Sequence, residues 1–314
     1  MKQKKLISII ILSYNVKDLL KQTLESLQSS IQYAKDQTKG MLDFETIVVD
    51  NNSQDGADLL VQNEFNWVKL VRNKENLGFA HGNNVGTKYI SENSNYVAFL
   101  NNDLVLQPDT MLTMFEFMEK TPDCGLATCR VDLWSGGLDI DAHRGFPTPW
   151  NAFCYFSGLE KLLGKTFPTI FGNYHLLYKD FSTTHEIDAC LGAFMIIPKT
   201  LGDKIGWWPK EYFLNGEDID LCFQIKNLQH QKIYWVNDTK VIHYKGASKG
   251  TKAQAGKHAK ASSSTKNLSI NSGINSMKIF YKKYYEKKYP FILTRAIYAG
   301  IWLLHQKRKM LGRE

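Results

Sequence analysis

Residues 96–103 read YVAFLNND, a run of apolar residues that stops abruptly at two asparagines and an aspartate. The apolar part predicts a strand buried inside a sheet, and the polar trio marks the end of that strand. The same pattern of an apolar run followed by a polar cluster occurs at residues 6–15 and 45–53, and residues 18–27 between them have the leucine spacing of an amphipathic helix. This alternation predicts an α/β fold with a mostly parallel central sheet.

The polar clusters at the strand ends are the first candidates for a binding site. Ligands of parallel α/β sheets bind beyond the carboxyl ends of the strands, where Ser13, Asp50 and Asp103 are expected. Asp103 is suited to hold Mg²⁺ or Mn²⁺, because hard cations bind carboxylates together with phosphate oxygens. Asp50 can accept hydrogen bonds from the base or ribose of a nucleotide. Asn and Asp are also common turn residues and Ser53 can cap a helix, so each cluster taken alone also fits a structural role.

Three further motifs suit a phosphate-containing substrate. Residues 76–86, NLGFAHGNNVG, form a Gly- and Asn-rich loop that opens onto a helix, and a helix N-terminus favours an anion. Residues 216–221, GEDIDL, place three carboxylates within four positions, and such crowding suits a general base. His243 follows a predicted strand and could complete a metal site. The alternatives are acids that complement a helix dipole and a half-buried structural histidine.

Taken in order, these motifs resemble those of the inverting family 2 glycosyltransferases of the GT-A fold, especially their bacterial rhamnosyltransferase-like branch. The matching segments span about 240 residues: ISIIILSYN (7–15), ETIVVDNNSQDG (45–56), NLGFAHGNNVG (76–86), FLNNDLVLQPD (99–109), LGAFMIIP (191–198), NGEDIDLC (215–222) and VIHYKGAS (241–248).

The resemblance implies a role for each candidate residue. Asp103 and His243 would bind the divalent cation, Asp218 would be the catalytic base, and Glu217 would support it. The reaction would be a single in-line displacement that inverts the anomeric carbon, with a glycan or lipid-linked acceptor in cell-surface polysaccharide synthesis. The residues implied to bind the nucleotide-diphosphate sugar are Ser13, Tyr14, Asp50, Asn52, Asn76, Gly78, Asn84 and Asn102.

The chain departs from the family pattern in three places. A single acid stands at the strand-end metal position, where relatives have a carboxylate pair. Gln224 stands where relatives usually carry an arginine that makes a supporting ion pair. Residues 206–213, GWWPKEYF, replace a Gly-Gly-Phe-Asp-like run that contacts the acceptor side.

The basic charge of the chain is concentrated in its last quarter. Residues 240–314 hold 17 Lys or Arg and two acids, a net charge of +15, whereas the preceding residues carry a net charge of −7. Residues 291–304 are mostly apolar and flanked by lysines, but a membrane span needs about 20 apolar residues. We therefore expect a basic amphipathic helical tail at 277–314 that lies on an anionic membrane surface, and no nucleic-acid partner.

The composition also suggests an organisation into domains. We expect a GT-A catalytic domain at 1–248, with a nucleotide-binding half at 1–110 and an acceptor-side half at 111–248, followed by a flexible lid or linker at 249–276. The five cysteines are scattered without metal-binding spacing. This pattern favours reduced thiols and a cytoplasmic protein, peripheral on the inner face of the plasma membrane.

Two other functions fit parts of the sequence. A catalytically inactive GT-A-like scaffold would explain the basic tail, but it would not need the Glu217-Asp218 pair or His243. A sugar nucleotidyltransferase would need a Gly-rich loop with Arg or Lys just after the first strand, and residues 13–20 contain no glycine.

Overall fold

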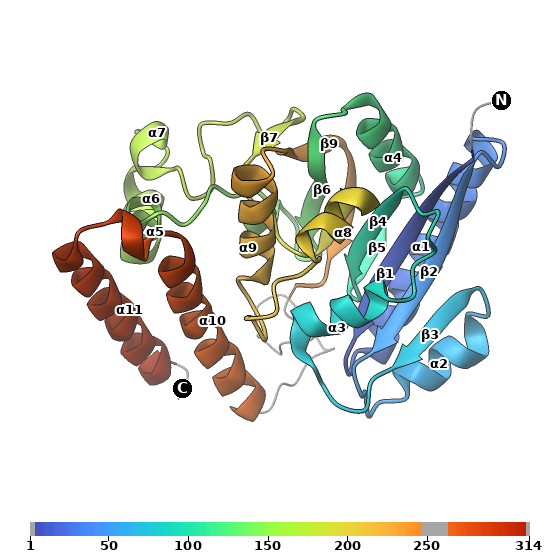
Figure 1. Cartoon of the computed structure of the whole chain (residues 1–314), viewed down its shortest axis with the longest axis horizontal. Helices are drawn as coiled ribbons and strands as arrows, with labels where there is room; N and C mark the ends of the chain where they lie inside the picture. Colours follow the sequence, from blue (N-terminus) through green and yellow to red (C-terminus); the bar gives the residue numbers. More distant parts are fainter. Residues whose placement is uncertain (1–3, 246–262, 312–314) are drawn as a thin grey trace.

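The computed structural model describes residues 4–245 and 263–311, which form a nine-stranded sheet with helices on both faces (Figure 1). The strands are β1 (Lys5–Ser13), β2 (Leu42–Asp50), β3 (Val68–Arg72), β4 (Tyr96–Asn101), β5 (Leu104–Leu106), β6 (Cys124–Leu133), β7 (His185–Ile187), β8 (Phe194–Pro198) and β9 (Lys232–His243). The helices are α1 (Lys17–Gln37), α2 (Ala57–Glu64), α3 (Gly78–Thr87), α4 (Thr110–Lys120), α5 (Pro149–Ser157), α6 (Leu159–Leu163), α7 (Pro168–Phe171), α8 (Lys199–Ile205), α9 (Glu217–Phe223), α10 (Ser263–Tyr284) and α11 (Phe291–Leu311).

The strand order is β3-β2-β1-β4-β8-β6-β9-β5, with β7 paired to β9. The strands of the first hundred residues are parallel, as predicted, and Ser13 lies opposite Asp50 while Leu12 lies opposite Asn101. Their carboxyl ends therefore meet at one edge of the sheet. The second half is mixed, because β8 runs antiparallel to β4 and both β5 and β7 run antiparallel to β9.

Both faces of the sheet are buried, which explains the continuous apolar run of β1. Ile9 and Ile11 pack with α1, α2 and α4, whereas Ile10 faces the layer that holds α3, α9 and α10. Side chains alternate between the two faces of a strand, so each face of β1 needs its own apolar residues.

The structure corrects three boundaries expected from the sequence. α1 continues beyond Leu27 to Gln37, because Ile31 and Ala34 extend its buried side. The sequence pattern of residues 232–243 predicts two short strands, but β9 is one long strand. Residues 263–276 of the predicted linker belong to α10, whose Ile274 is buried against the domain, so that part of the prediction is wrong. Residues 249–262 of the predicted linker lie outside the described residues.

The C-terminal helices α10 and α11 lie side by side at one end of the molecule, on the same side as the short helices α5–α7 (Figure 1). Within residues 4–245 and 263–311, no helix is both long and apolar enough to cross a membrane.

The packing of α3 on the sheet predicts different responses at two helical glycines. A Cβ at Gly86 would lie 2.6 Å from Ile10 Cγ2, whereas a Cβ at Gly300 in α11 would meet no atom within 4 Å. We expect Gly86→Ala to lower the free energy of unfolding by about 1–3 kcal/mol through overpacking. Gly300→Ala should leave it unchanged or raise it by up to about 1 kcal/mol. Urea unfolding measures both, and equal effects would contradict the described packing.

Candidate active site

Asp50 and Ser13 lie at the shared edge of the parallel strands, where the sequence places them. Asp50 Oδ2 accepts a hydrogen bond from the Ser53 amide at 3.0 Å, so Asp50 also shapes the turn after β2. Asp50 Oδ1 and Ser13 Oγ are buried and make no hydrogen bond within the described part of the chain. A buried polar atom without a partner is costly in a folded protein. The two atoms thus offer one acceptor and one hydroxyl to a polar ligand at this edge.

The segment 76–86, most of which forms α3, has a structural role that the sequence does not reveal. Gly78 has a φ of +77°, and a Cβ there would lie 2.3 Å from the Phe213 carbonyl oxygen. The side chain of Asn84 donates to the Trp208 carbonyl at 2.8 Å and accepts from its amide at 3.0 Å. Gly78 and Asn84 are therefore suited to the close contact between this segment and the 207–213 loop. Their contacts with a nucleotide stay predictions.

The remaining nucleotide candidates differ in exposure. Tyr14 and Asn52 are solvent-exposed beyond β1 and β2, and Asn52 has a left-handed φ of +67°. Asn76 Oδ1 accepts from the Gly78 amide at 2.9 Å, which holds the loop in shape. Asn102 is buried beside Asp103. Tyr14 and Asn52 thus lie where a ligand could reach them, whereas Asn76 and Asn102 are part of the framework.

Asp103 and His243, the two metal candidates, are in direct contact. Leu104 of β5 pairs with His243 of β9, which brings His243 Nε2 to 3.3 Å from Asp103 Oδ1. At the other ring nitrogen, Asp139 Oδ2 lies 3.3 Å from His243 Nδ1. Burial alone would lower the pKa of His243, but the Asp103 and Asp139 carboxylates outweigh it and raise this pKa to about 9. His243 bridges two buried carboxylates.

A series of charged side chains extends from Asp139 to Glu160 of α6. Lys245 pairs with both Asp139 and Asp141, and Asp141 Oδ1 lies 3.5 Å from His175 Nε2. His175 Nδ1 lies 2.8 Å from Glu160 Oε2. Burial alone would raise the pKa of Asp141, but the His175 hydrogen bond and the Lys245 ammonium outweigh it and hold this pKa well below its usual range. Acids and bases alternate along the whole chain of contacts.

The predicted base, Asp218, is also bound by a cation. The short helix α9 begins after Gly216, which has a φ of +86°, and Glu217 and Asp218 are both buried in its first turn. Arg144 Nη2 lies 2.8 Å from Asp218 Oδ2 and also donates to the Cys190 carbonyl at 3.2 Å. Burial opposes the charge of Arg144, but the neighbouring acids outweigh it and raise the pKa of the guanidinium.

One connected set of charges therefore joins the predicted base to the predicted metal ligand. Arg144 contacts Asp218 and also interacts with Asp141 through its charge, so the link between the two sets is a charge interaction and not an ion pair or hydrogen bond among the described side chains. We call this set the charged network; its members are Asp218, Arg144, Asp141, Lys245, Asp139, His243 and Asp103.

Four residues of the charged network are not among the site residues predicted from the sequence. Asp139 and Asp141 form an Asp-x-Asp pair that could have been noticed, and Lys245 lies inside the VIHYKGAS segment. Arg144 has no local signal, because only the fold brings it to Asp218.

The donor set at Asp103 fits a divalent cation in part. Asp103 Oδ1 is buried and makes an ion pair but no hydrogen bond, so it can act as a ligand. Mg²⁺ and Mn²⁺ need only one or two carboxylates when phosphate oxygens complete the coordination. Over the described residues no cluster of three or more His, Cys, Asp or Glu side chains has metal-binding geometry. The residues at Asp103 therefore suit a divalent cation whose coordination is completed by the phosphate oxygens of a bound nucleotide.

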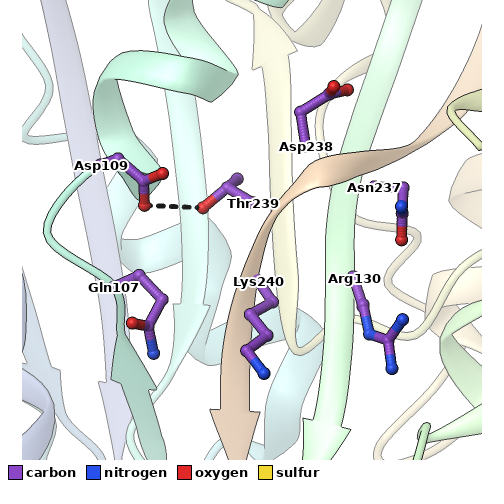
Figure 2. A pocket seen from close by; sticks show the side chains of 7 residues that line it. All are labelled: Gln107, Asp109, Arg130, Asn237, Asp238, Thr239 and Lys240. Carbon is purple, nitrogen blue, oxygen red and sulfur yellow. Dashed lines mark hydrogen bonds between the residues drawn. The ribbon is translucent and has the colours of Figure 1, made fainter. Parts of the chain in front are cut away.

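A polar hollow of about 470 Å³ lies elsewhere, at the opposite end of the β5–β9 pairing from His243 (Figure 2). Figure 2 shows Thr239 hydrogen-bonded to Asp109, with Arg130 and Lys240 projecting from adjacent strands. Both of these cations are already paired with Asp132, at 2.8 and 3.1 Å. We place the chemistry at the charged network, because the hollow holds none of its members.

Comparison with known proteins decides the family. The sequence model for "Glycosyl transferase family 2" matches residues 8–183, more than half of the chain. The chain belongs to glycosyl transferase family 2. Glu217, Asp218 and His243 lie outside the matched residues, so their roles in this glycosyltransferase stay predictions.

Two curated relatives of this glycosyltransferase are similar at low identity. "Rhamnosyltransferase WbbL" from Escherichia coli (strain K12) is 25% identical over 246 residues, covering 76% of this chain and 83% of WbbL. "Low-salt glycan biosynthesis hexosyltransferase Agl10" from Haloferax volcanii is 24% identical over 222 residues, covering 70% of this chain and 61% of Agl10. The chain thus spans most of WbbL but less than two thirds of Agl10.

Solved structures share the fold. S. aureus TarS 1–349 matches with a TM-score of 0.50 and 15% identity, over 85% of this chain and 64% of TarS. GalNAc-T7, solved with UDP, GalNAc and Mn²⁺, matches with a TM-score of 0.55 and 14% identity, over 77% of this chain and 44% of GalNAc-T7. These likenesses confirm the predicted GT-A fold.

The buried Arg144–Asp218 pair predicts a strong coupling in stability. Removing one member of a buried pair leaves an unbalanced charge, so Arg144→Met should lower the free energy of unfolding by about 3–5 kcal/mol. Adding Asp218→Asn to Arg144→Met should recover part of that loss. In the exposed Arg72–Asp58 pair, Arg72→Met should cost about 0–1 kcal/mol. Urea unfolding of these three variants and of Asp218→Asn alone measures this, and additive losses at Arg144 and Asp218 would contradict the pair.

Proposed function

We propose that this family 2 glycosyltransferase transfers a sugar from a nucleotide-diphosphate donor to a glycan or lipid-linked acceptor, with inversion, in the synthesis of cell-surface polysaccharide. The observation that carries the proposal is the charged network, which joins the metal candidate Asp103 to the base candidate Asp218. The relatives support the substrate class: WbbL is named a rhamnosyltransferase, and TarS and GalNAc-T7 have been solved with UDP-GlcNAc and with UDP and Mn²⁺.

The donor would bind across the carboxyl ends of β1, β2 and β4. Asp50 Oδ1 and Ser13 Oγ would contact the nucleoside, because both are buried polar atoms with free hydrogen-bonding capacity. Asp103 would hold Mg²⁺ or Mn²⁺, which neutralises charge on the leaving diphosphate, and His243 would join it as a ligand after releasing the proton that Asp103 and Asp139 favour. His243 Nε2 is the ring nitrogen that faces Asp103, and Nδ1 faces Asp139.

Asp218 would act as the base in the displacement. The acceptor oxygen forms a bond to the anomeric carbon as the bond from that carbon to the diphosphate oxygen breaks, and the hydroxyl proton passes to Asp218. Arg144 occupies Oδ2, so Oδ1 is the oxygen left to take the proton, with the Ile219 amide donating to it at 2.8 Å. Attack opposite to the leaving group inverts the anomeric carbon.

Removal of the base carboxylate tests the proposal. Asp218→Asn should lower metal-dependent release of nucleoside diphosphate from the donor sugar by about 10²–10⁴-fold, because general base catalysis contributes that much. The matched control is Asp123→Asn, at an exposed acid on the surface, which should keep wild-type activity. Chromatographic assay of the released nucleotide measures both. Full activity in Asp218→Asn would remove this residue as the base.

We further propose that the protein works in the cytoplasm, on the inner face of the plasma membrane, and that α11 binds the membrane. Ile292 and Leu303 are 82% and 60% exposed and lie three turns apart on one side of the helix. Phe291 and Trp302 are also exposed there. Lysines flank this apolar surface, which is the composition of a helix that lies in the interface of an anionic bilayer.

Acidic substitutions on this apolar surface should weaken membrane binding. In the full chain, the double variant Ile292→Glu/Leu303→Glu should reduce co-sedimentation with phosphatidylglycerol vesicles by at least about tenfold, because apolar burial is lost and the two new carboxylates are repelled by the anionic lipid. Leu59→Glu, at an equally exposed leucine of α2, is the control and should bind as wild type. Wild-type binding by the double variant would rule out α11 as the contact.

A further inference from the structure

Asp220 is a fully buried carboxylate two positions after the predicted base. Its side chain is 0% exposed. Within the domain, the Tyr212 hydroxyl donates to Oδ2 at 2.9 Å and the Gln224 amide donates to Oδ1 at 2.7 Å. Two more donors come from the C-terminal helix α10: Lys283 Nζ lies 3.0 Å from Oδ2, and the Tyr284 hydroxyl lies 2.8 Å from Oδ1.

Lys283 provides the balancing charge in this cluster. Among the side chains that the structure describes, it is the cation within 4.0 Å of Asp220. A buried carboxylate without a cation would be strongly destabilising, whereas neutral hydroxyl and amide donors only satisfy its lone pairs. Exposed Glu211 also contacts Lys283, with its Oε1 3.2 Å from the Lys283 ammonium.

α10 contacts both ends of α9 and not only Asp220. The Phe223 and Tyr284 rings stack with a centroid separation of 4.0 Å at the end of α9. At its start, the Ser276 hydroxyl donates to the Asn215 carbonyl, and a Cβ at Gly216 would lie 2.8 Å from Ser276 Cβ. Figure 1 shows α10 next to α9. The short helix is therefore held along its length by the C-terminal helix.

Asp218 and Asp220 point in opposite directions from this helix. Side chains two positions apart on an α-helix point about 200° away from each other. The partners of the two acids agree with this, because Arg144 binds Asp218 and Lys283 binds Asp220. Like charges this close in sequence repel each other, so each acid needs its own cation from a different part of the chain.

We propose that Lys283 is a positioning residue for glycosyl transfer: its ion pair with Asp220 fixes α9 so that Asp218 is presented to Arg144 and to the acceptor. This inference rests on the proposed function, in which Asp218 is the base. It makes α10 part of the active-site framework. Truncation before α10 would therefore remove this support together with α11.

Kinetics of Lys283 variants test the inference. Lys283→Met should lower kcat by about 10- to 100-fold, a usual cost of misplacing a catalytic group, while KM for the donor stays within about twofold. Lys282→Met removes the neighbouring, exposed lysine and should leave kcat unchanged. Lys283→Arg should retain most activity because it keeps a cation at the same site.

A second-site rescue makes the test sharper. Gln224 already contacts Asp220, and it lines the same hollow of about 330 Å³ as Lys283, which leaves room for a longer side chain. Adding Gln224→Arg to Lys283→Met should therefore restore kcat at least about fivefold, since the guanidinium replaces the lost cation. Unchanged kcat in folded Lys283→Met, or no rescue in the folded double variant, would overturn the inference.

Asp220→Asn covers the case in which Lys283→Met does not fold. This variant removes the buried charge from the other side, leaves Asp218 intact and should lower kcat to a similar extent; wild-type kcat would overturn the inference. A merely structural ion pair would lower the unfolding midpoint without changing kcat in the folded enzyme. Full activity in Asp218→Asn would instead reject the proposed function, so the two failures are distinguishable.

Discussion

Balance of buried negative charge is the constraint on which the active-site region depends. Asp103, Asp139, Asp218 and Asp220 are all nearly or fully buried, and a buried carboxylate is strongly destabilising unless it is paired or hydrogen-bonded. The cations His243, Arg144 and Lys283 come from three distant parts of the chain. Each ion pair therefore ties one segment to another, and together they fix the catalytic helix relative to the sheet edge.

This arrangement links the C-terminal region to catalysis. The inner side of the helical pair α10–α11 buries Phe280 and Tyr281 against the domain and contributes Lys283, while the outer side of α11 is apolar and exposed. The same two helices would then support the base on one side and bind a membrane on the other. Such a position suits an enzyme whose acceptor is attached to a lipid.

Much of the fold could be predicted from the sequence, because local patterns determine it. The apolar runs before Ser13, Asp50 and Asn101 are strands, and their ends meet as the parallel pairing requires. The partners of the site residues could not be predicted, since Arg144 and Lys283 reach their acids only through tertiary packing. Gln224 shows this most clearly: it lacks the charge of the expected arginine, and Lys283 from α10 provides that charge beside Asp220.

A nucleotide-diphosphate sugar should bind at the strand ends together with a cation held by Asp103. Thermal unfolding of the full chain against a panel of nucleotide sugars, with and without Mn²⁺, tests it most directly. A ligand at 100 times its Kd should stabilise the fold by about 2.7 kcal/mol, so a clear rise in Tm is expected with one nucleotide class. This rise in Tm should need Mn²⁺ and should be lost in Asp103→Asn. A rise of equal size in Asp103→Asn, or no rise with any donor, would contradict it.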